Sequence, residues 1–239
     1  MVTAVIVQAR MASTRLPGKV LKPLRNGTVL REVLRRCRVI PGVDIVSCAV
    51  PVGAANDPVA FEAESCGAAV CRGHETDVLD RYTRAARALK ADTVMRVTSD
   101  CPLIDPGLCG EVLGALRAES ADYACNNMPP SFPHGLDCEA FSAVALERAF
   151  ENARLPEERE HVTPWLRTQS DVRHAVVTGP GGDLAHQRWT LDYPEDYAFL
   201  VALFDLLAPA PEIPGWRVVA DLVAARPDLE RINRNRRQR

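Results

Sequence analysis

The chain has 239 residues, of which 47% are hydrophobic and 25% charged, a composition typical of a packed globular protein and not of a disordered one. A formal net charge of −2 argues against nucleic-acid binding by the whole surface. No apolar run reaches the ~18 residues of a transmembrane helix, and no signal peptide is apparent. We therefore expect a cytoplasmic protein that binds neither nucleic acid nor a membrane.

The eight cysteines lack the spacing of a metal site or a disulfide framework. No Cys-x-x-Cys pair occurs, and the tightest pair is Cys66 and Cys71. Cys48, Cys71 and Cys101 fall in or beside predicted strands, where cysteine behaves as a small hydrophobic residue. We expect all eight thiols to be reduced.

The first twenty residues join a predicted strand to a basic loop. Residues 2–7, VTAVIV, form an apolar, β-branched run typical of a buried parallel strand. The loop after it carries three cations and two small hydroxyl residues: Arg10, Arg15, Lys19, Ser13 and Thr14. Ligands of parallel sheets lie at the carboxyl ends of strands, and Arg and Lys bind phosphate oxygens. The pattern favours a phosphate site over the alternative, a solvated surface loop.

The first half of the chain alternates strands with helices. Hydrophobic spacing predicts helices at 29–38, 56–66 and 77–90, and further strands at 44–50, 68–71 and 93–98. Asn56 and Pro58 are a cap and first-turn pair for the second helix, and Gly67 ends it. This order predicts an α/β fold with a mostly parallel sheet flanked by helices.

The second half is richer in loops. Residues 123–139 contain several Pro, Gly and Asn residues and are predicted to be loop-rich. Helices are predicted at 142–154, 162–168, 196–207 and 218–225, and strands at 172–177 and 188–191. The basic tail, 231–239, is expected to be a mobile, solvated end.

Two aspartates follow predicted strands. Asp100 comes two residues after the predicted strand at 93–98. It lies beside the end of the first strand if these two strands are neighbours in the sheet. Such a carboxylate can hold Mg²⁺ against a phosphate, or can simply cap a turn. Asp192 precedes a Pro-opened helix, where it can point toward the ligand end of the sheet, whereas Glu195 and Asp196 in the first turn complement the helix dipole.

A family resemblance joins these segments. The run QARMASTRLPGK resembles the opening signature of the cytidylyltransferases that activate acidic sugars, the CMP-sialate and CMP-3-deoxy-manno-octulosonate synthetases, and most closely their spore-coat-polysaccharide branch. The segments around Arg72, Asp100 and Asp192 resemble further motifs of that family, in the same order. The resemblance implies a Rossmann-like nucleotide-diphospho-sugar transferase fold, with one domain over 1–239 and an excursion at 123–190 for acceptor binding or dimerisation.

The resemblance also implies a reaction. CMP passes from CTP to an acidic sugar of nonulosonic or ulosonic type, or a similar acceptor, with release of pyrophosphate, in surface polysaccharide or glycoconjugate biosynthesis. The implied partners are CTP, the small acceptor and a second copy of the chain in a homodimer, and the implied cofactor is Mg²⁺. The candidate catalytic residues are Arg10, Arg15, Lys19, Asp100 and Asp192, the last two being the metal ligands.

Two sets of binding residues are carried over from the motifs. The candidate nucleotide-binding residues are Gln8, Ala9, Arg10, Ser13, Thr14, Arg15, Lys19, Arg72, Asp80 and Ser99. The candidate acceptor-binding residues are Asn126, His134, Gly135, Asp137, Glu139, Glu160 and His161. Asp80 is alternatively a partner in a helix-surface ion pair, a histidine of this kind is alternatively structural, and residues 134–139 are alternatively a dimer interface.

Two other classes of protein stay open. A glycosyltransferase of the same fold would use an Asp-x-Asp metal motif, and none occurs in this chain. A catalytically silent nucleotide-binding module would have no physical need for both aspartates and all three loop cations.

Overall fold

One mixed sheet forms the centre of the molecule. The computed structural model describes residues 1–207 and 213–236. In the described ranges, seven strands pair in the order β5-β4-β1-β6-β8-β7-β9. The strands are β1 (Thr3–Gln8), β4 (Ile45–Pro51), β5 (Ala69–Gly73), β6 (Thr93–Thr98), β7 (Tyr123–Cys125), β8 (Glu139–Ser142) and β9 (His174–Val176), and a separate small hairpin pairs β2 (Pro23–Leu24) with β3 (Gly27–Thr28).

The sheet is mostly parallel. Strand β1 lies between β4 and β6 and runs parallel to both, and β5 continues the parallel order. Strand β8 is antiparallel to its neighbours β6 and β7, while β9 is parallel to β7. The predicted fold class, a mostly parallel mixed sheet flanked by helices, is confirmed.

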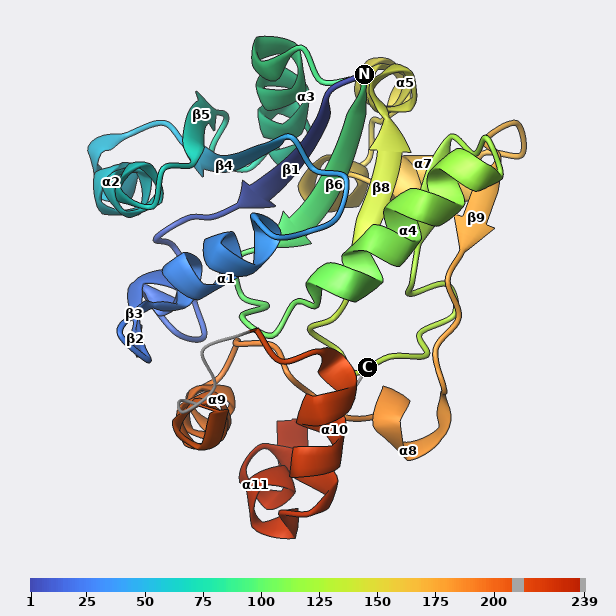
Figure 1. Ribbon diagram of the computed structural model, residues 1–239. Helices are drawn as coiled ribbons and strands as arrows, with labels where there is room; N and C mark the ends of the chain where they lie inside the picture. The colour runs from blue at the N-terminus through green and yellow to red at the C-terminus, as the bar shows by residue number, and fades with distance from the viewer. Residues whose placement is uncertain (208–212, 237–239) are drawn as a thin grey trace.

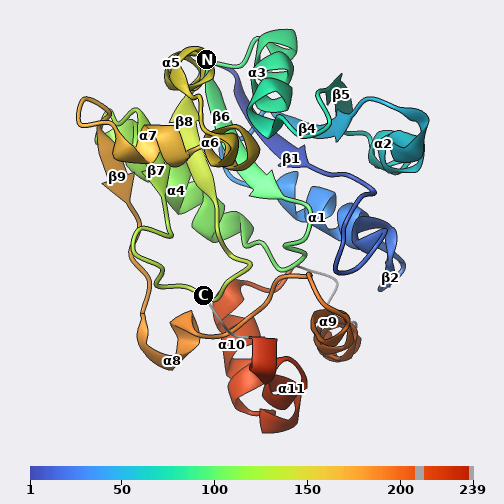
Figure 2. The ribbon, with the colours of Figure 1, turned by 180° about the vertical axis from the view of Figure 1, so that it is seen from behind.

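Alternation along β1 divides the core between two faces. Val5 and Val7 pack with α1, α2 and α4 on one face, whereas Ala4 and Ile6 pack with α3, α5 and α7 on the other (Figures 1 and 2). The helices have these bounds: α1 Val29–Cys37, α2 Asp57–Ser65, α3 Val78–Leu89, α4 Pro106–Ala118, α5 Ala143–Asn152, α6 Pro156–His161, α7 Pro164–Thr168, α8 Gly182–Ala185, α9 Pro194–Leu207, α10 Trp216–Ala224 and α11 Pro227–Ile232. Such two-sided burial explains why β1 is a continuous apolar run.

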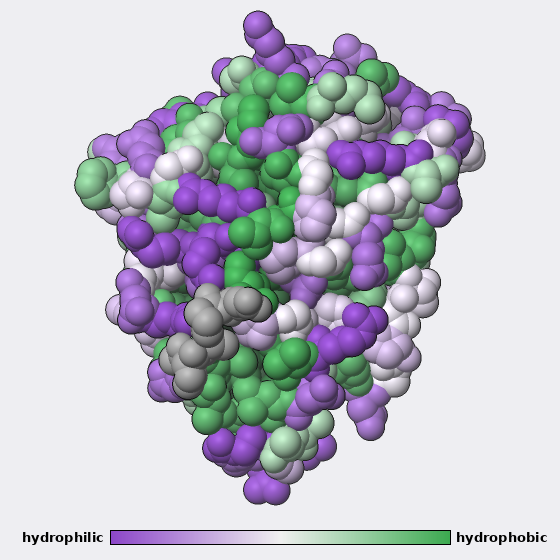
Figure 3. All heavy atoms as spheres, in the orientation of Figure 1, coloured by the Kyte–Doolittle hydropathy of each residue, from purple (hydrophilic) through white to green (hydrophobic). Residues whose placement is uncertain are grey.

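Helices α9, α10 and α11 form a separate layer beyond the carboxyl ends of β1 and β6 (Figure 1). Their apolar residues make a third core cluster with Leu103, Leu136 and the buried Trp189. Figure 3 shows hydrophobic residues on the surface of this layer. Among the exposed large hydrophobic residues are Leu206 of α9 and Val218 of α10. No helix in the described ranges combines the length and apolar character needed to cross a membrane.

One predicted strand is wrong, and part of the predicted tail has regular structure. Residues 188–191 do not form a strand of the sheet: Arg188 makes one isolated bridge with His134, and the chain then turns so that the Leu191 N–H donates to the Asp100 carbonyl at 2.8 Å. In the basic tail, Arg236 lies in a 3₁₀ turn (Arg234–Arg236) and pairs with Glu195, while residues 237–239 lie outside the described part. Arg231, Arg234 and Arg236 are exposed, as expected of a solvated end, and the mobility of the tail stays a prediction.

Several elements were not predicted, among them α4, α6, α8, α11 and the short strands β2, β3, β7 and β8, and one predicted helix is interrupted. Helix α4 begins at Pro106, and strands β7 and β8 lie at the two ends of the loop-rich stretch. The helix predicted at 162–168 begins only at Pro164, because Val162 has φ +72° and separates α6 from α7. Short strands between Pro- and Gly-rich loops carry too little periodicity to be recognised from sequence.

Glu139, a candidate acceptor-binding residue, is the centre of a buried ion-pair network at the start of β8. Its side chain is 1% exposed and pairs with Arg96 of β6 at 2.5 Å and with Arg167 of α7. It also accepts hydrogen bonds from the hydroxyls of Tyr123 at 2.5 Å and Thr163 at 2.6 Å. Burial alone would raise the pKa of Glu139, but the two guanidinium charges outweigh it and lower the pKa to about 2.

Gly135 occupies a position that only glycine fits. Its φ is +117°, and a Cβ atom would lie 2.6 Å from the carbonyl carbon of Trp189. We expect Gly135→Ala to lower the free energy of unfolding by about 2–4 kcal/mol through backbone strain and the clash. Gly114→Ala is the control, because an added Cβ meets nothing within 4 Å there and alanine favours the helix. Relative to the unmodified protein, the midpoint of urea denaturation should fall in Gly135→Ala and rise in Gly114→Ala. Equal midpoints in the two variants would contradict this role of Gly135.

Glu139→Gln should lower the free energy of unfolding at pH 7 by about 3–5 kcal/mol, because it leaves two partly buried guanidinium groups without their buried carboxylate. The carboxylate's contribution is fully present above its ordinary pKa of 4.5 and is lost as the pH falls toward about 2. The variant should therefore have a flatter acid limb in a plot of stability against pH.

The control for Glu139→Gln is Glu147→Gln, which breaks an exposed ion pair with Arg87. It should change neither the free energy of unfolding nor its dependence on pH by much. Chemical denaturation of the three proteins from pH 2 to pH 7 measures the effect. An acid limb as steep in Glu139→Gln as in the unmodified protein would show that Glu139 does not produce it.

Candidate functional site

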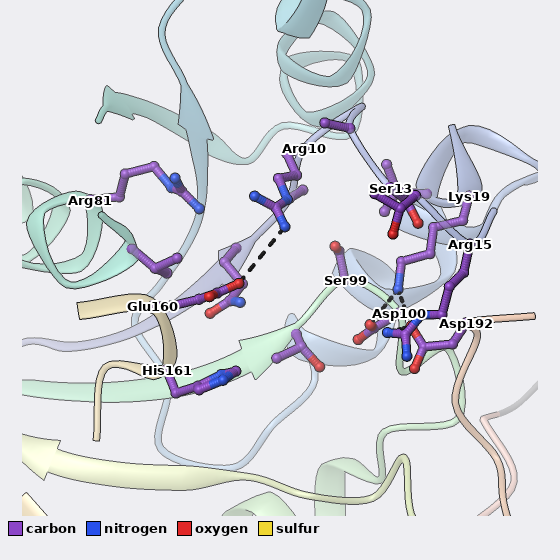
Figure 4. A pocket seen from close by; sticks show the side chains of 17 residues that line it. Arg10, Ser13, Arg15, Lys19, Arg81, Ser99, Asp100, Glu160, His161 and Asp192 are labelled. Carbon is purple, nitrogen blue, oxygen red and sulfur yellow. Dashed lines mark hydrogen bonds and ion pairs between the residues drawn. The ribbon is translucent and has the colours of Figure 1, made fainter. Parts of the chain in front are cut away.

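A polar pocket of about 250 Å³ opens at the carboxyl ends of β1 and β6 (Figure 4). Its walls come from the loop after β1, the end of β6 and the residues after it, the first turn of α3, the end of α6, and Asp192 two residues before α9. The lining residues are Gln8, Ala9, Arg10, Ala12, Ser13, Thr14, Arg15, Lys19, Val20, Val78, Arg81, Thr98, Ser99, Asp100, Glu160, His161 and Asp192. Twelve of the residues predicted from sequence are therefore brought to one place.

Strand pairing places the first two segments side by side. Gln8 is the register partner of Thr98, and the Ser99 N–H donates to the Gln8 carbonyl at 3.2 Å. The segments that follow β1 and β6 therefore begin side by side at the same edge of the sheet. This confirms the condition on which the interpretation of Asp100 depended.

The loop after β1 is held in one shape by hydrogen bonds. The Met11 N–H donates to Oδ1 of Asn56 at 3.0 Å, and the Gly18 N–H donates to the Met11 carbonyl at 3.2 Å. Gly18 has φ +65°, and the 3₁₀ turn Lys19–Leu21 starts directly after it. Asn56 was expected to cap α2, but no side-chain capping bond is made there. Its side chain instead fixes the loop that places Lys19.

The Lys19 ammonium group joins the two aspartates. Nζ lies 2.7 Å from Oδ2 of Asp100, 2.7 Å from Oδ1 of Asp192 and 2.9 Å from the carbonyl oxygen of Leu191. Burial opposes ionisation of Asp100, but the positive charge and hydrogen bond of Lys19 outweigh burial and lower its pKa to about 2. The same balance lowers the pKa of Asp192. Two ionised carboxylates thus converge on one cation.

Asp192 is surrounded by cations and held by the α9–α11 layer. Arg15 lies 3.1 Å from its Oδ1, and Arg188 lies 3.1 Å from its Oδ2. Arg188 also pairs with the fully buried Asp196, whose Oδ2 accepts the N–H of Asp192 at 2.9 Å. Asn233, after α11, donates to both the Arg188 carbonyl and Asp196. Asp196 is therefore a buried anchor for the start of α9, beyond the dipole role expected of it.

The other end of the pocket is formed by α6 and α3. Glu160 lies 4.0 Å from Arg10 across the pocket. Val162 is buried at φ +72°, and the Thr163 N–H donates to the His161 carbonyl at 2.8 Å, which makes a tight three-residue turn. This turn ends α6 with Glu160 and His161 at the pocket (Figure 4).

Arg81 was not predicted. It is 2% exposed, and its Nη1 donates to the carbonyls of His74 at 2.6 Å and Glu75 at 2.8 Å. Val78 and Arg81 are three residues apart and share the face of α3 that lines the pocket. Nothing in the sequence marks Val78 as facing the pocket, so helical spacing alone could not have identified Arg81, whereas Asp80 attracted attention through its charge.

Arg72 and Asp80 lie outside the pocket lining. Arg72 pairs with Asp57 at 2.6 Å. Asp80 pairs with Arg84 at 2.8 Å and accepts the His74 N–H at 3.2 Å. The nucleotide contacts proposed for these two residues stay predictions, and the helix-surface ion pair considered for Asp80 is present.

Five candidate acceptor residues also lie outside the lining. Asn126 binds the backbone of Leu136 and Cys138, and Gly135 packs against Trp189. Three charged or titratable residues complete the set: His134, Asp137 and Glu139. His134 lies 3.4 Å from Arg188, and Asp137 accepts the Gly135 N–H at 3.0 Å. Their contacts shape the segment that packs against residues 187–190, and their acceptor roles stay predictions.

Within the described ranges, no cluster of three or more His, Cys, Asp or Glu side chains is placed to hold a metal ion. The pair of Asp100 and Asp192 nevertheless suits Mg²⁺ bound to a nucleotide, because Mg²⁺ takes one or two carboxylates and completes its shell with phosphate oxygens and water.

Comparison with known proteins agrees with this architecture. A spore coat polysaccharide biosynthesis protein of Bacillus subtilis, SpsF, is 30% identical over 230 residues, which cover 93% of this chain and 94% of the relative. An uncharacterized protein of Methanocaldococcus jannaschii is 30% identical over 239 residues, or 98% of this chain and 95% of the relative. A 3-deoxy-manno-octulosonate cytidylyltransferase of Anaeromyxobacter dehalogenans is 34% identical over 118 residues, 48% of this chain and 47% of the relative.

Solved structures share the fold. A cytidylyltransferase from Leptospira borgpetersenii superposes with a TM-score of 0.89 at 27% identity, covering 96% of this chain and 97% of that one. A CMP:2-keto-3-deoxy-manno-octonic acid synthetase complexed with CTP superposes with a TM-score of 0.65 at 17% identity, covering 87% and 99%. These likenesses confirm the predicted Rossmann-like nucleotidyltransferase fold.

The cytidylyltransferase family model matches residues 4–198. That range contains β1 and its basic loop, the end of β6 with Asp100, and Asp192 before α9. Since the match spans every segment that lines the pocket, the chain belongs to the cytidylyltransferase family.

Proposed function

We propose that the protein transfers CMP from CTP to an acidic sugar of nonulosonic or ulosonic type. An acceptor hydroxyl oxygen, after losing its proton to solvent, attacks the α-phosphorus of CTP, the bond between that phosphorus and the bridging oxygen to the β-phosphate breaks, and pyrophosphate leaves with the bond's electron pair. The observation that carries the proposal is the convergence of a basic loop and two ionised aspartates in one pocket. Membership of the cytidylyltransferase family supports it.

The loop cations are suited to the triphosphate. Arg10 and Arg15 are each partly exposed at the pocket, with 41% and 52% of their side chains accessible. Guanidinium groups bind phosphate oxygens through paired hydrogen bonds and stabilise the charge that develops on a leaving pyrophosphate. Arg15 also stacks 5.1 Å from the ring centre of Tyr193, which limits its motion. The chain therefore positions the triphosphate and neutralises its charge, without a covalent intermediate.

Asp100 and Asp192 would hold Mg²⁺. Their carboxylates are ionised and converge, which is the donor set that Mg²⁺ shares with a nucleotide phosphate. When bound, the ion supplies positive charge to the reacting phosphate and acceptor oxygens.

The nucleoside end of the pocket is proposed to lie at Gln8 and Arg81. Figure 4 shows Arg81 on the side of the pocket opposite Lys19 and Asp100. Within the described ranges, Oε1 of Gln8 and Nε of Arg81 are buried without a hydrogen-bond partner. A buried acceptor and donor of this kind suit the polar edge of a nucleobase such as cytosine, which offers an amino group beside ring acceptors.

The acceptor is proposed to enter beside Glu160 and His161, and the segment 123–190 to provide acceptor or dimer contacts. A role in surface polysaccharide biosynthesis is suggested by the name of the Bacillus subtilis relative. We propose that the protein works in the cytoplasm as a homodimer.

Pyrophosphate release measured with each of the four nucleoside triphosphates tests the reaction. Sugar acids, sugar phosphates and phosphonates serve as acceptors, and we expect release only with CTP and a nonulosonic-type acid in the presence of Mg²⁺. Binding of CTP without turnover of any acceptor would instead indicate a silent nucleotide-binding module. Release of a nucleoside diphosphate from a nucleotide sugar would indicate a glycosyltransferase.

Asp192→Asn should separate binding from transfer. The loop cations remain, so CTP affinity measured without a divalent ion should not fall, while the rate of transfer with Mg²⁺ should fall at least about 100-fold because one charged group at the reacting phosphate is lost. Calorimetry with CTP and pyrophosphate release measure the two quantities. Asp205→Asn, at the exposed far end of α9, is the matched control and should keep both. Unchanged transfer in Asp192→Asn would contradict the proposed role of this carboxylate.

A further inference from the structure

Lys19 uses all of its hydrogen-bonding capacity on the two aspartates and one backbone carbonyl. An ammonium group has three N–H donors, and Nζ of Lys19 has three acceptors within 2.9 Å: Asp100, Asp192 and the Leu191 carbonyl. A phosphate oxygen can gain a hydrogen bond from Lys19 only if one of these contacts is given up. In this structure Lys19 is therefore bound to the aspartates, and contact with a phosphate requires it to leave at least one of its present acceptors.

The carboxylates are committed to cations in turn. Oδ1 of Asp192 faces both Lys19 and Arg15, and Oδ2 faces Arg188. Oδ2 of Asp100 faces Lys19. A divalent ion bound to both carboxylates would lie beside the Lys19 ammonium, which already touches both of them. Two cations in such contact repel strongly in a partly buried site.

The position of Lys19 is built by the fold. Its side chain is 13% exposed, and its backbone starts the 3₁₀ turn fixed by Gly18 and by the buried Val20. The two aspartates are held independently, Asp100 by the end of β6 and Asp192 by the bonds of Asp196 and Arg188. Rotation of one flexible side chain is enough to take the ammonium away while the carboxylates stay in place.

We propose that Lys19 is the resident counter-cation of the aspartate pair and excludes a divalent ion until a triphosphate draws Lys19 and Arg15 away. The triphosphate oxygens offer these cations new anionic partners, and the freed carboxylates then take the divalent ion. Nucleotide and metal therefore enter as a coupled pair, and the protein without nucleotide has low metal affinity. The identity of the anion that draws Lys19 away rests on the proposed function, whereas the mutual exclusion of Lys19 and the metal does not.

Binding of Mn²⁺ to the protein without nucleotide or acceptor tests the exclusion. Electron paramagnetic resonance of free Mn²⁺ gives the affinity directly. We expect Lys19→Met to bind Mn²⁺ at least about tenfold more tightly than the unmodified protein, because the charge that opposes the ion is removed. An affinity equal to or weaker than that of the unmodified protein would overturn the proposal.

Three further variants make the result specific. Lys19→Gln keeps a hydrogen-bonding group without a charge, so it should show the same gain and guards against misfolding of Lys19→Met. Lys19→Met combined with Asp192→Asn should lose the gain, and a gain that persists would place the Mn²⁺ elsewhere and overturn the proposal. Lys22→Met is the matched control, since Lys22 lies outside the pocket lining over the ring of Tyr197 and its loss should leave the affinity unchanged.

The outcomes separate this inference from the proposed function. If pyrophosphate release fails with every acceptor but Lys19→Met binds Mn²⁺ more tightly, the proposed function falls and the exclusion by Lys19 stands. If transfer of CMP is observed but removal of the Lys19 charge brings no gain in Mn²⁺ affinity, only the role of Lys19 as resident counter-cation is overturned.

Discussion

The ion pairs of Lys19 with Asp100 and Asp192 are the interaction on which the architecture of the pocket depends. They connect residues 81 and 173 positions apart in the chain. Each group alone would be unfavourable in a partly buried pocket, because two carboxylates repel each other and an unpaired charge is poorly solvated. Together they are stable, and they bring the basic loop, the end of β6 and the start of α9 to one point.

Two different parts of the fold hold the two aspartates. Asp100 follows β6 directly, so the parallel sheet places it. Asp192 depends on the α9–α11 layer, where Arg188, the buried Asp196 and Asn233 fix the start of α9. The C-terminal helices, which line no part of the pocket beyond this contact, are thereby linked to the chemistry of the site. The pocket is a junction between the sheet and this layer.

The first half of the chain could be predicted well because its signals are local. The β-branched run of β1 and the strand at Thr93–Thr98 were both recognised from hydrophobic pattern alone. In the second half, the predicted helices at 142–154, 196–207 and 218–225 and the predicted strand at 172–177 are present as α5, α9, α10 and β9. The prediction failed at 188–191, where the chain makes one isolated bridge with His134 and a backbone hydrogen bond to Asp100 in place of a strand. Glu139 carries an acidic charge in a family motif, yet its neighbours Arg96 and Arg167 come from other elements, and sequence gives no sign that they meet it.

The sequence by itself determined the elements that make the sheet, the basic loop and the presence of two aspartates after strand-like segments, because each of these follows from local pattern and residue chemistry. Only the tertiary structure decided which charges meet. Pairing over long sequence separations depends on strand order and on the packing of distant helices, which leave no periodic signal in the chain. This is why the opening loop was recognised as basic from sequence, whereas the commitment of Lys19 to both aspartates became visible only in three dimensions.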